Sequence, residues 1–306
     1  MKEWNGKRYH SIDYFLKEKF NEKIFKIPLD AGFTCPNRDG TVAFGGCIFC
    51  SKKGSGDFTV DSKKSIHDQF TDMKKVMEKK WKCKKYIAYF QAFTNTYGPI
   101  ERLKEVYFEA LKEDGTIGIA IATRPDCLNE EVLDLLSIIN EKTYLWVELG
   151  LQTANEDVAA YINRGYKLNI FDEAMKNLKK RCIDVVVHII FGLPGETKES
   201  MMDSVKYVSL KNIDGIKFHL LHLVKDSPLY EMSCKDGIKF LSKEEYIDLI
   251  CKSISILNEN IVIHRLTGDG PRDTLVGPLW SLKKWEILNE IDNELKIRNI
   301  YQGIYS

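Results

Sequence analysis

The chain has 306 residues, of which 44% are apolar, so it can bury a substantial core. Its 45 Lys and Arg residues almost balance 44 Asp and Glu residues, and the net charge of +1 gives no general argument for a nucleic-acid partner. The 20 Gly and 8 Pro fall below the average share of about 12% for these residues, which excludes collagen-like and disordered classes. Because no N-terminal signal core or membrane-length apolar run is present, we expect a soluble cytoplasmic protein without a membrane partner.

Apolar runs that indicate β-strands recur along the chain, with helical segments between them. Most of the runs are near-continuous rather than alternating, as expected of strands buried on both faces. The predicted strands cover residues 24–31, 86–92, 116–123, 144–151, 183–191, 215–223 and 260–266.

Helix start signals stand between these runs. Ser, Asp and Asn side chains can accept from the free backbone N–H groups of a first turn, and a Glu three residues after a Ser completes a capping box. Proline suits a first helical position because it lacks an N–H group. The signals are Asp61 and Ser62 before a helix that runs to residue 81, then Pro99, Asn129, and Ser242 with Glu245.

Strands and helices that alternate in this way predict an α/β fold with parallel strands and right-handed crossovers. The number of units fits a partial (β/α)6 TIM-like barrel with short terminal extensions. A doubly wound open sheet is the alternative, although no Gly-rich phosphate loop follows the first strand. We expect one domain over residues 1–306, with its core at about 24–270 and a C-terminal helical extension at about 271–306.

The most informative segment directly follows the first predicted strand. Cys35 is followed by eleven residues, then Cys47, two residues and Cys50. In a βα barrel this is the carboxyl end of a strand, where active sites form. Three cysteines on a [4Fe–4S] cluster would leave one iron without a protein ligand, open to a substrate or cofactor.

Two other interpretations fit the same spacing, namely a zinc knuckle and three unrelated buried thiols. A closed structural zinc site needs four ligands, and no fourth ligand is evident nearby. The remaining cysteines stand alone, and each is expected to be a small core residue. They are Cys83, Cys127, Cys182, Cys234 and Cys251.

The cysteine triad stands in order with three further strand-end segments, residues 90–97, 148–153 and 268–272. Together these segments resemble those of radical S-adenosylmethionine (SAM) enzymes over nearly the whole chain. The longer first spacing departs from the common Cys-x3-Cys-x2-Cys form. It resembles the YhcC/YtqA-type family, which is related to the elongator-type and oxygen-independent coproporphyrinogen oxidase enzymes.

The resemblance implies an enzyme that holds a [4Fe–4S] cluster and SAM. In such enzymes the open iron binds the amino and carboxylate groups of SAM. One electron, here expected from a reduced flavodoxin- or ferredoxin-type donor, cleaves SAM to methionine and a 5′-deoxyadenosyl radical that abstracts hydrogen from the substrate. Cys35, Cys47 and Cys50 match the cluster ligands, and Phe49 matches an aromatic residue that packs near the adenine.

The end of the second predicted strand departs from the family pattern. Most relatives carry a Gly-rich turn there, whose backbone receives the SAM amino group, whereas this chain has Gln91, Ala92 and Phe93. Carbonyl contacts need no particular side chain, so the resemblance still implies a cofactor-binding role for these residues. Thr94 follows them and could bond to SAM or substrate.

Polar residues at the later strands complete the implied site. Gln152 and Arg164 match residues that contact the ribose region and the carboxylate of SAM, and an Arg fork suits a carboxylate. His188 occupies a place where relatives put a polar ribose contact, and it is also a catalytic candidate. Glu148 is a second catalytic candidate because a buried carboxylate needs a partner. His219 is the third, since it could reach the substrate.

Two further groups carry open interpretations. His222 lies three positions after His219, so the two should face opposite sides of an ideal strand and not share a metal. A polar cluster at the last strand and its loop could bind an anionic substrate, although surface ion pairs explain it equally well. Its members are His264, Arg265, Asp269 and Arg272.

The substrate is indicated mainly by the resemblance. Residues 74–85 contain seven lysines and Trp81, and residues 176–181 and 283–285 are also basic, so these segments could grip RNA phosphates. Relatives of this type are associated with tRNA wobble uridine, which implies a tRNA partner and conversion of a 5-carboxymethylaminomethyl group to 5-aminomethyl. The alternatives are the same chemistry on a small metabolite or tetrapyrrole, and a non-catalytic zinc-binding RNA-interaction module.

Overall fold

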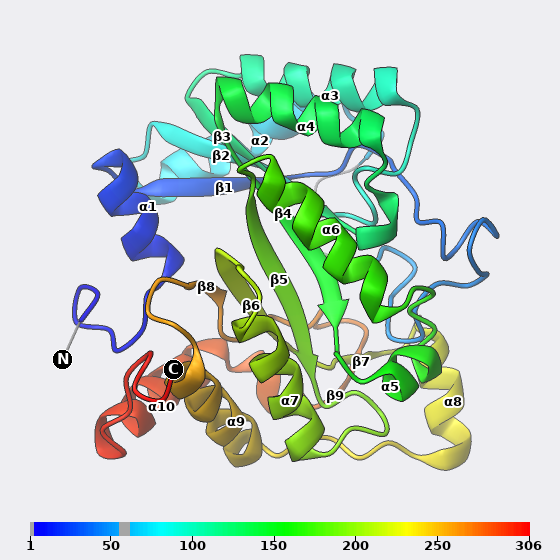
Figure 1. Cartoon of the computed structure of the whole chain (residues 1–306), viewed down its shortest axis with the longest axis vertical. Coiled ribbons are helices and arrows are strands. Elements are labelled where there is room, and N and C mark those ends of the chain that lie inside the picture. Colours follow the sequence, from blue (N-terminus) through cyan, green and yellow to red (C-terminus); the bar gives the residue numbers. More distant parts are fainter. Residues whose placement is uncertain (1–2, 55–61) are drawn as a thin grey trace.

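The computed structural model describes residues 3–54 and 62–306, and this part of the chain forms a seven-stranded parallel sheet. The sheet curls into a half-barrel with helices on its outer side (Figure 1). In spatial order its strands are β1 (Ile24–Leu29), β2 (Lys85–Phe90), β3 (Thr116–Thr123), β4 (Tyr144–Gln152), β5 (Asp184–Phe191), β6 (Gly215–Leu220) and β8 (Val262–Arg265). The predicted partial barrel is confirmed, and its seven strands fall within or overlap the seven predicted strand segments, with β8 inside the last one at 260–266.

Helices connect the strands in the expected alternation. The connections between consecutive strands of the first six are α2 (Ile66–Lys80), α3 (Ile100–Lys112), η1 (Pro125–Cys127) with α4 (Glu130–Lys142), α5 (Glu156–Tyr161) with α6 (Leu168–Lys180), and α7 (Lys198–Ser209). A short antiparallel ribbon, α8 (Pro228–Asp236), α9 (Lys243–Ile256) and α10 (Lys284–Ile297) follow β6 in the chain. The ribbon pairs β7 (Leu223–Val224) with β9 (Leu275–Gly277), and η2 (Leu279–Leu282) precedes α10.

Side chains alternate between the two faces of the sheet. In β4, Leu145, Val147 and Leu149 belong to the large core under the outer helices. Trp146 points to the other face, where it packs with Leu16 of α1 (Ile12–Phe20). In the described part of the chain, α1 therefore covers the inner face of the sheet near the strand starts, next to β1 and β8.

The helix start signals are largely confirmed. The Asn129 side chain caps α4, and Ser242 with Glu245 forms the capping box of α9. Pro99 lies one position before α3. The predicted cap of α2 was wrong, because the side chain of Ser65 accepts from the N–H of Asp68 instead of Ser62 capping an earlier turn. Asp61 lies outside the described residues.

The lone cysteines are only partly core residues. Cys83 and Cys251 are buried as expected, and Cys127 is half-buried. Cys182 and Cys234 are exposed, since each lies at or near the outer end of a surface helix. Among the described residues, no helix is both long and apolar enough to cross a membrane.

Candidate active site

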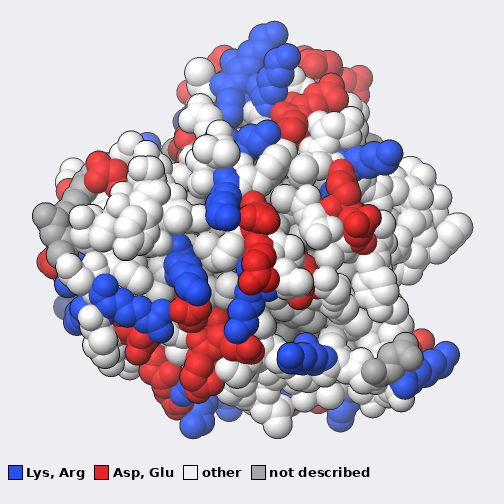
Figure 2. All heavy atoms as spheres, turned by 60° about the horizontal axis from the view of Figure 1, so that its bottom comes forward, with Lys and Arg blue, Asp and Glu red and all other residues white. Residues whose placement is uncertain are grey.

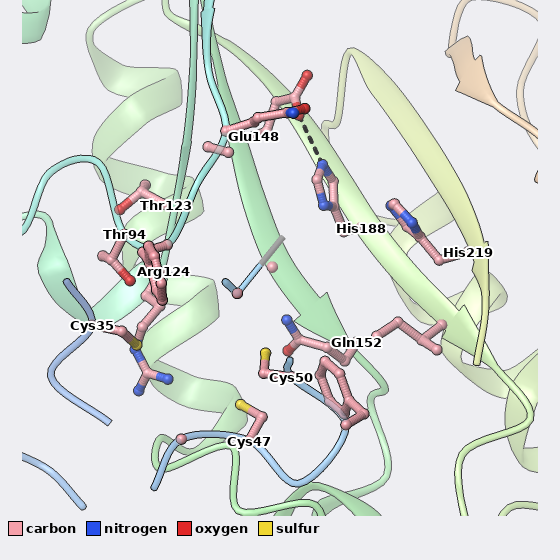
Figure 3. A pocket seen from close by; sticks show the side chains of 18 of the residues that line it. Cys35, Cys47, Cys50, Thr94, Thr123, Arg124, Glu148, Gln152, His188 and His219 are labelled. Atoms are coloured by element: carbon pink, nitrogen blue, oxygen red, sulfur yellow. Dashed lines mark hydrogen bonds and ion pairs between the residues drawn. The ribbon is translucent and has the colours of Figure 1, made fainter. Parts of the chain in front are cut away.

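A cavity of about 300 Å³ opens at the carboxyl ends of the strands (Figure 3). The loop after β1 forms one side, and the ends of β2 through β6 and β8 form the rest. The three predicted cluster cysteines line it, and so do Phe49, Gln91, Phe93, Thr94, Glu148, Gln152, His188 and His219. The structure therefore gathers most of the residues singled out in the sequence into one site.

The cysteine loop is fastened to the segment that follows α5. The Asn37 side-chain amide donates to the carbonyl of Asn163, and the Asn163 side chain donates to the Gly46 carbonyl at 2.8 Å. Gly165 has a φ of +83°, and an added Cβ would lie 2.4 Å from Asn37 Oδ1. A glycine at this position thus allows the two segments to approach closely.

The three thiols fit a cluster better than a single ion. Cys35, Cys47 and Cys50 line the same cavity, yet no group of three His, Cys, Asp or Glu side chains in the described ranges is gathered closely enough to hold one metal ion. On a cluster each thiolate binds a different iron, so the sulfurs need not converge on one point. The Cys47 thiol is hydrogen-bonded to Cys50, which raises the pKa of Cys47 and lowers that of Cys50.

Two strand-end residues of the cavity have unusual backbone conformations. Phe93 has a φ of 57° and Gln152 a φ of 66°, in the left-handed region that costs energy for residues other than glycine. Both side chains line the cavity, whereas Ala92 between Gln91 and Phe93 is 1% exposed and does not. Gln91 and Phe93, two of the three residues at the end of β2 for which the resemblance implies a cofactor-binding role, therefore line the cavity, and Ala92 does not.

The structure does not bring Arg164 to the cavity. Its guanidinium is 1% exposed and donates to the backbone carbonyls of Leu151 and Thr153 and to Glu156. Arg124, which sequence reasoning missed, lines the cavity instead and lies near Cys35 in Figure 3. The path of the chain from residue 153 to residue 166, which includes α5, decides which arginine reaches the cavity. No local sequence signal distinguishes Arg124 from Arg164.

A buried hydrogen-bonded network surrounds Glu148 at the inner end of the cavity. Its carboxylate accepts from Tyr89 at 2.7 Å and from Trp146 at 2.9 Å, lies 3.0 Å from Nε2 of His188, and forms an ion pair with Lys217. Burial alone would raise the pKa of Glu148, but Lys217 and His188 outweigh it and hold that pKa well below its usual value. Lys217 was missed, although a lysine inside the apolar run 215–223 is a usable signal.

His219 and His222 both line the cavity, so the expectation that they face opposite sides was wrong. The reason is that β6 ends at Leu220, and His222 lies in the turn beyond it, where strand alternation no longer applies. The His188 and His219 rings lie 4.9 Å apart between centroids. Desolvation by burial lowers the pKa of each of these three histidines, to about 4 for His222.

The four polar residues predicted to cluster at the last strand and its loop do not lie together in the structure. Arg265 lines the cavity, whereas the His264 ring packs edge-on against Trp146 at 5.5 Å. Asp269 forms an ion pair with Lys284 at 2.6 Å, and Arg272 is exposed. Only one member of this cluster therefore faces the site.

The cysteine loop and the half-barrel match a known class of enzyme. Residues 35–208 match the radical SAM superfamily, and residues 213–297 match the radical SAM C-terminal domain. The chain belongs to the radical SAM superfamily.

Within this superfamily, the chain is similar to several individual proteins. YtqA of Bacillus subtilis is 50% identical over 297 residues, which cover 97% of this chain and 92% of that protein. YhcC of Escherichia coli is 33% identical over 281 residues, covering 92% and 90%. The solved structure of the archaeal Methanocaldococcus infernus Elp3 shares the fold, with a TM-score of 0.70 at 18% identity over 91% of this chain and 64% of that one.

Membership in the radical SAM superfamily decides between an enzyme and a non-catalytic zinc module, both of which the sequence alone left open. The protein is a radical SAM enzyme, and its cofactors are a [4Fe–4S] cluster and SAM. A non-catalytic zinc module is therefore not the function of this chain.

Proposed function

We propose that this enzyme modifies the wobble uridine of tRNA, converting a 5-carboxymethylaminomethyl group to 5-aminomethyl. The resemblance of the sequence to the YhcC/YtqA-type family supports this substrate. We further propose that the described elements act as one domain in the cytoplasm, with a reduced flavodoxin- or ferredoxin-type electron donor.

The observation that carries the radical SAM chemistry of this proposal is that Cys35, Cys47 and Cys50 line one cavity. We assign these thiolates as the cluster ligands, because all three line one cavity at the carboxyl ends of the strands and no fourth cysteine of the described chain lines it. When bound, the reduced cluster supplies the electron that splits SAM into methionine and the radical that abstracts hydrogen. The fastening of the loop by Asn37 and Asn163 keeps the thiolates in place.

The residues around the thiols suit SAM. Phe49 offers an aromatic face for the adenine, and the turns at Phe93 and Gln152 offer backbone and amide groups. Arg124 lies at the cysteine end of the cavity and keeps two of its five N–H donors free of the bonds to Asp126 and to the Arg164 carbonyl. Arg124 is therefore better placed than Arg164 for the SAM carboxylate.

The opposite end of the cavity suits the substrate. Glu148 and His188 lie there, with His219 beside them (Figure 3). Glu148 holds Lys217 and His188 in fixed positions, so we assign it a positioning role. His188 and His219 present imidazole groups toward the cavity and are the groups that would contact the reacting part of the substrate.

Of the basic segments noted in the sequence, the one around Trp81 gives the best support for an RNA partner. Lys and Arg alternate with Asp and Glu over the face in Figure 2, and Lys179 and Arg181 are paired with acidic residues. The strongest remaining feature is the Trp81 patch, made of Lys23, Phe25, Lys80 and Trp81. The Phe25 and Trp81 rings stack with centroids 5.0 Å apart, and both lysines lie within 6 Å of the Trp81 ring. Exposed rings among lysines can stack bases and hold phosphates.

The test uses the protein reconstituted with iron and sulfide without oxygen. 5′-Deoxyadenosine formation is measured with bulk tRNA, with RNA-free metabolite pools and with no substrate. The proposal expects tRNA to stimulate turnover and expects cells that lack the protein to accumulate the carboxymethylaminomethyl nucleoside, detected by mass spectrometry. An unchanged nucleoside profile would exclude the tRNA substrate, and stimulation by the metabolite pool alone would favour the small-molecule alternative.

A further inference from the structure

The inner end of the cavity carries more positive than negative side chains. Arg265 of β8 lines this end, and Lys26 of β1 and Lys217 of β6 lie behind it, close enough to interact with Arg265 and Glu148. Glu148 is the one carboxylate among the described residues that line the cavity. Burial lowers the pKa of Lys26, and Arg265 lowers it further while Glu148 opposes them. One carboxylate therefore does not neutralise this group of cations.

Of these three cations, Arg265 is the one that lines the cavity, and it lacks a hydrogen-bond or ion-pair partner among the described residues. It is the register neighbour of Lys217, so its side chain leaves the sheet on the same inner face. Within residues 3–54 and 62–306 it makes no hydrogen bond or ion pair, although it lines the cavity. A guanidinium offers five N–H donors in a planar fork, and a half-buried one without an acceptor is suited to an anion.

Two imidazoles next to Arg265 are also incompletely bonded. The Nε2 atoms of His219 and His222 are buried and have no hydrogen-bond partner in the described part of the chain. Buried polar atoms are normally satisfied, so an unsatisfied pair that lines one cavity indicates a missing ligand. Each ring can donate one N–H to an acceptor placed between it and Arg265.

We propose that Arg265, His219 and His222 form a subsite for a carboxylate of the substrate. The subsite lies with Glu148 and Lys217 at the inner end, whereas the SAM carboxylate belongs at the cysteine end with Arg124. A neutral group here would leave the guanidinium donors unsatisfied, and an Arg fork matches the two oxygens of a carboxylate. The subsite stands on this geometry, and its assignment to the carboxymethyl group of the uridine rests on the proposed function.

A phosphate of the RNA backbone is the other source of such an anion. In a folded RNA the phosphates lie on the outside of the strand, and a splayed-out base is the part that can enter a pocket. The group that reaches farthest into the half-barrel is then a substituent of the base. This favours the carboxylate.

The experiment measures anion binding rather than turnover. The anaerobically reconstituted enzyme, saturated with SAM, is unfolded thermally in increasing acetate, inorganic phosphate or acetamide, the neutral analogue of acetate. A ligand that binds the native state raises the midpoint in proportion to its occupancy. We expect acetate to stabilise the wild type, acetamide to have no effect, and Arg265→Gln to weaken acetate binding by at least about tenfold. Arg272→Gln, which removes an exposed arginine, should bind acetate as the wild type does.

The outcomes separate the subsite from the tRNA assignment. Equal acetate binding by Arg265→Gln and the wild type, or equal effects of acetate and acetamide, would overturn the subsite. Tighter Arg265-dependent binding of phosphate than of acetate would overturn the choice of a carboxylate. Arg265-dependent acetate binding together with unchanged tRNA nucleosides in cells lacking the protein would keep the subsite and reject the wobble-uridine substrate.

Discussion

Lys217 and Glu148 form an ion pair inside the half-barrel, with side-chain exposures of 1% and 0%. Removing one partner of such a pair leaves a buried charge without compensation, which typically costs about 3–5 kcal/mol. We predict that Glu148→Gln lowers the free energy of unfolding of the reconstituted protein by about 3 kcal/mol. Denaturation by urea under anaerobic conditions measures it.

The control for this prediction removes both charges. In Glu148→Gln combined with Lys217→Met, no buried charge of the pair remains, so at least half of the lost free energy should return. Equal stability of the Glu148→Gln variant and the wild type would show that Glu148 and Lys217 do not form a buried ion pair.

The buried histidines predict a dependence of stability on pH. Their folded pKa values lie below the unfolded value of about 6.5, so the unfolded state binds more protons between these values and stability is lost as the pH falls through this window. His222, with a pKa of about 4, should contribute a slope of up to about 1.4 kcal/mol per pH unit. Glu148 contributes only below its unfolded pKa of about 4.3, where protonation of the unfolded state begins.

Urea denaturation of the SAM-free protein between pH 4.5 and 6.5 tests this window. His222→Asn should show a shallower slope than the wild type, whereas His67→Asn should not, because His67 is exposed beside Glu113 and its pKa is raised by that carboxylate. Parallel slopes for the wild type and His222→Asn would contradict the neutral, buried state of His222.

The strands and the cysteine loop can be predicted from the sequence, because buried parallel strands are continuous apolar runs and the loop directly follows one of them. Arg124 and Arg164 cannot be distinguished in the sequence, since only the path of the chain after β4 decides which guanidinium is bonded to the carbonyls of Leu151 and Thr153. His219 and His222 are wrongly assigned to opposite faces, because alternation holds only while the strand continues. Residues fixed by periodicity could thus be predicted, and residues fixed by the path of a turn could not.

If Cys35, Cys47 and Cys50 hold the cluster, replacing them should affect iron content and SAM cleavage, whereas replacing another cysteine should not. Cys35→Ala, Cys47→Ala and Cys50→Ala should each reduce iron content and abolish SAM cleavage, because a missing thiolate leaves a second iron without a protein ligand. Cys83→Ala is the matched control, since Cys83 is buried beside Tyr86 away from the cavity. Iron and sulfide analysis with a 5′-deoxyadenosine assay measures both effects, and full activity in any of the first three variants would reject the assignment.

Gly165 lies close to Asn37 of the cysteine loop, so we predict that a larger residue at position 165 makes the iron–sulfur cluster more labile. In Gly165→Ala the new methyl group meets Asn37 Oδ1, so Asn37 must move and its bond to the Asn163 carbonyl weakens. Gly237→Ala is the matched control, with a φ of +70° and nothing within 4 Å of its added Cβ. Both variants carry the cost of an alanine at positive φ, about 1–3 kcal/mol, but only Gly165→Ala should lose iron faster to a chelator. Equal rates of iron loss would show that the contact does not hold the loop.

The Trp81 patch predicts where tRNA binding is sensitive to charge. Lys80 lies 5.9 Å from the Trp81 ring and neighbours Lys79 at the end of α2, and neither lysine has an ion-pair partner among the described residues. Reversing both charges should weaken tRNA binding and reduce the slope of log affinity against log salt by about two, one for each lost phosphate contact.

Lys104→Glu is the control for the charge reversal, because Lys104 is exposed on α3 among Glu101, Glu105 and Glu109. Filter binding over a range of salt concentrations should separate the two variants, while 5′-deoxyadenosine formation without RNA stays the same in both because neither site touches the cavity. If the Lys79 and Lys80 variant keeps the wild-type salt slope, the RNA contacts lie elsewhere on the surface, and the strand-end face around the cavity becomes the surface to map next.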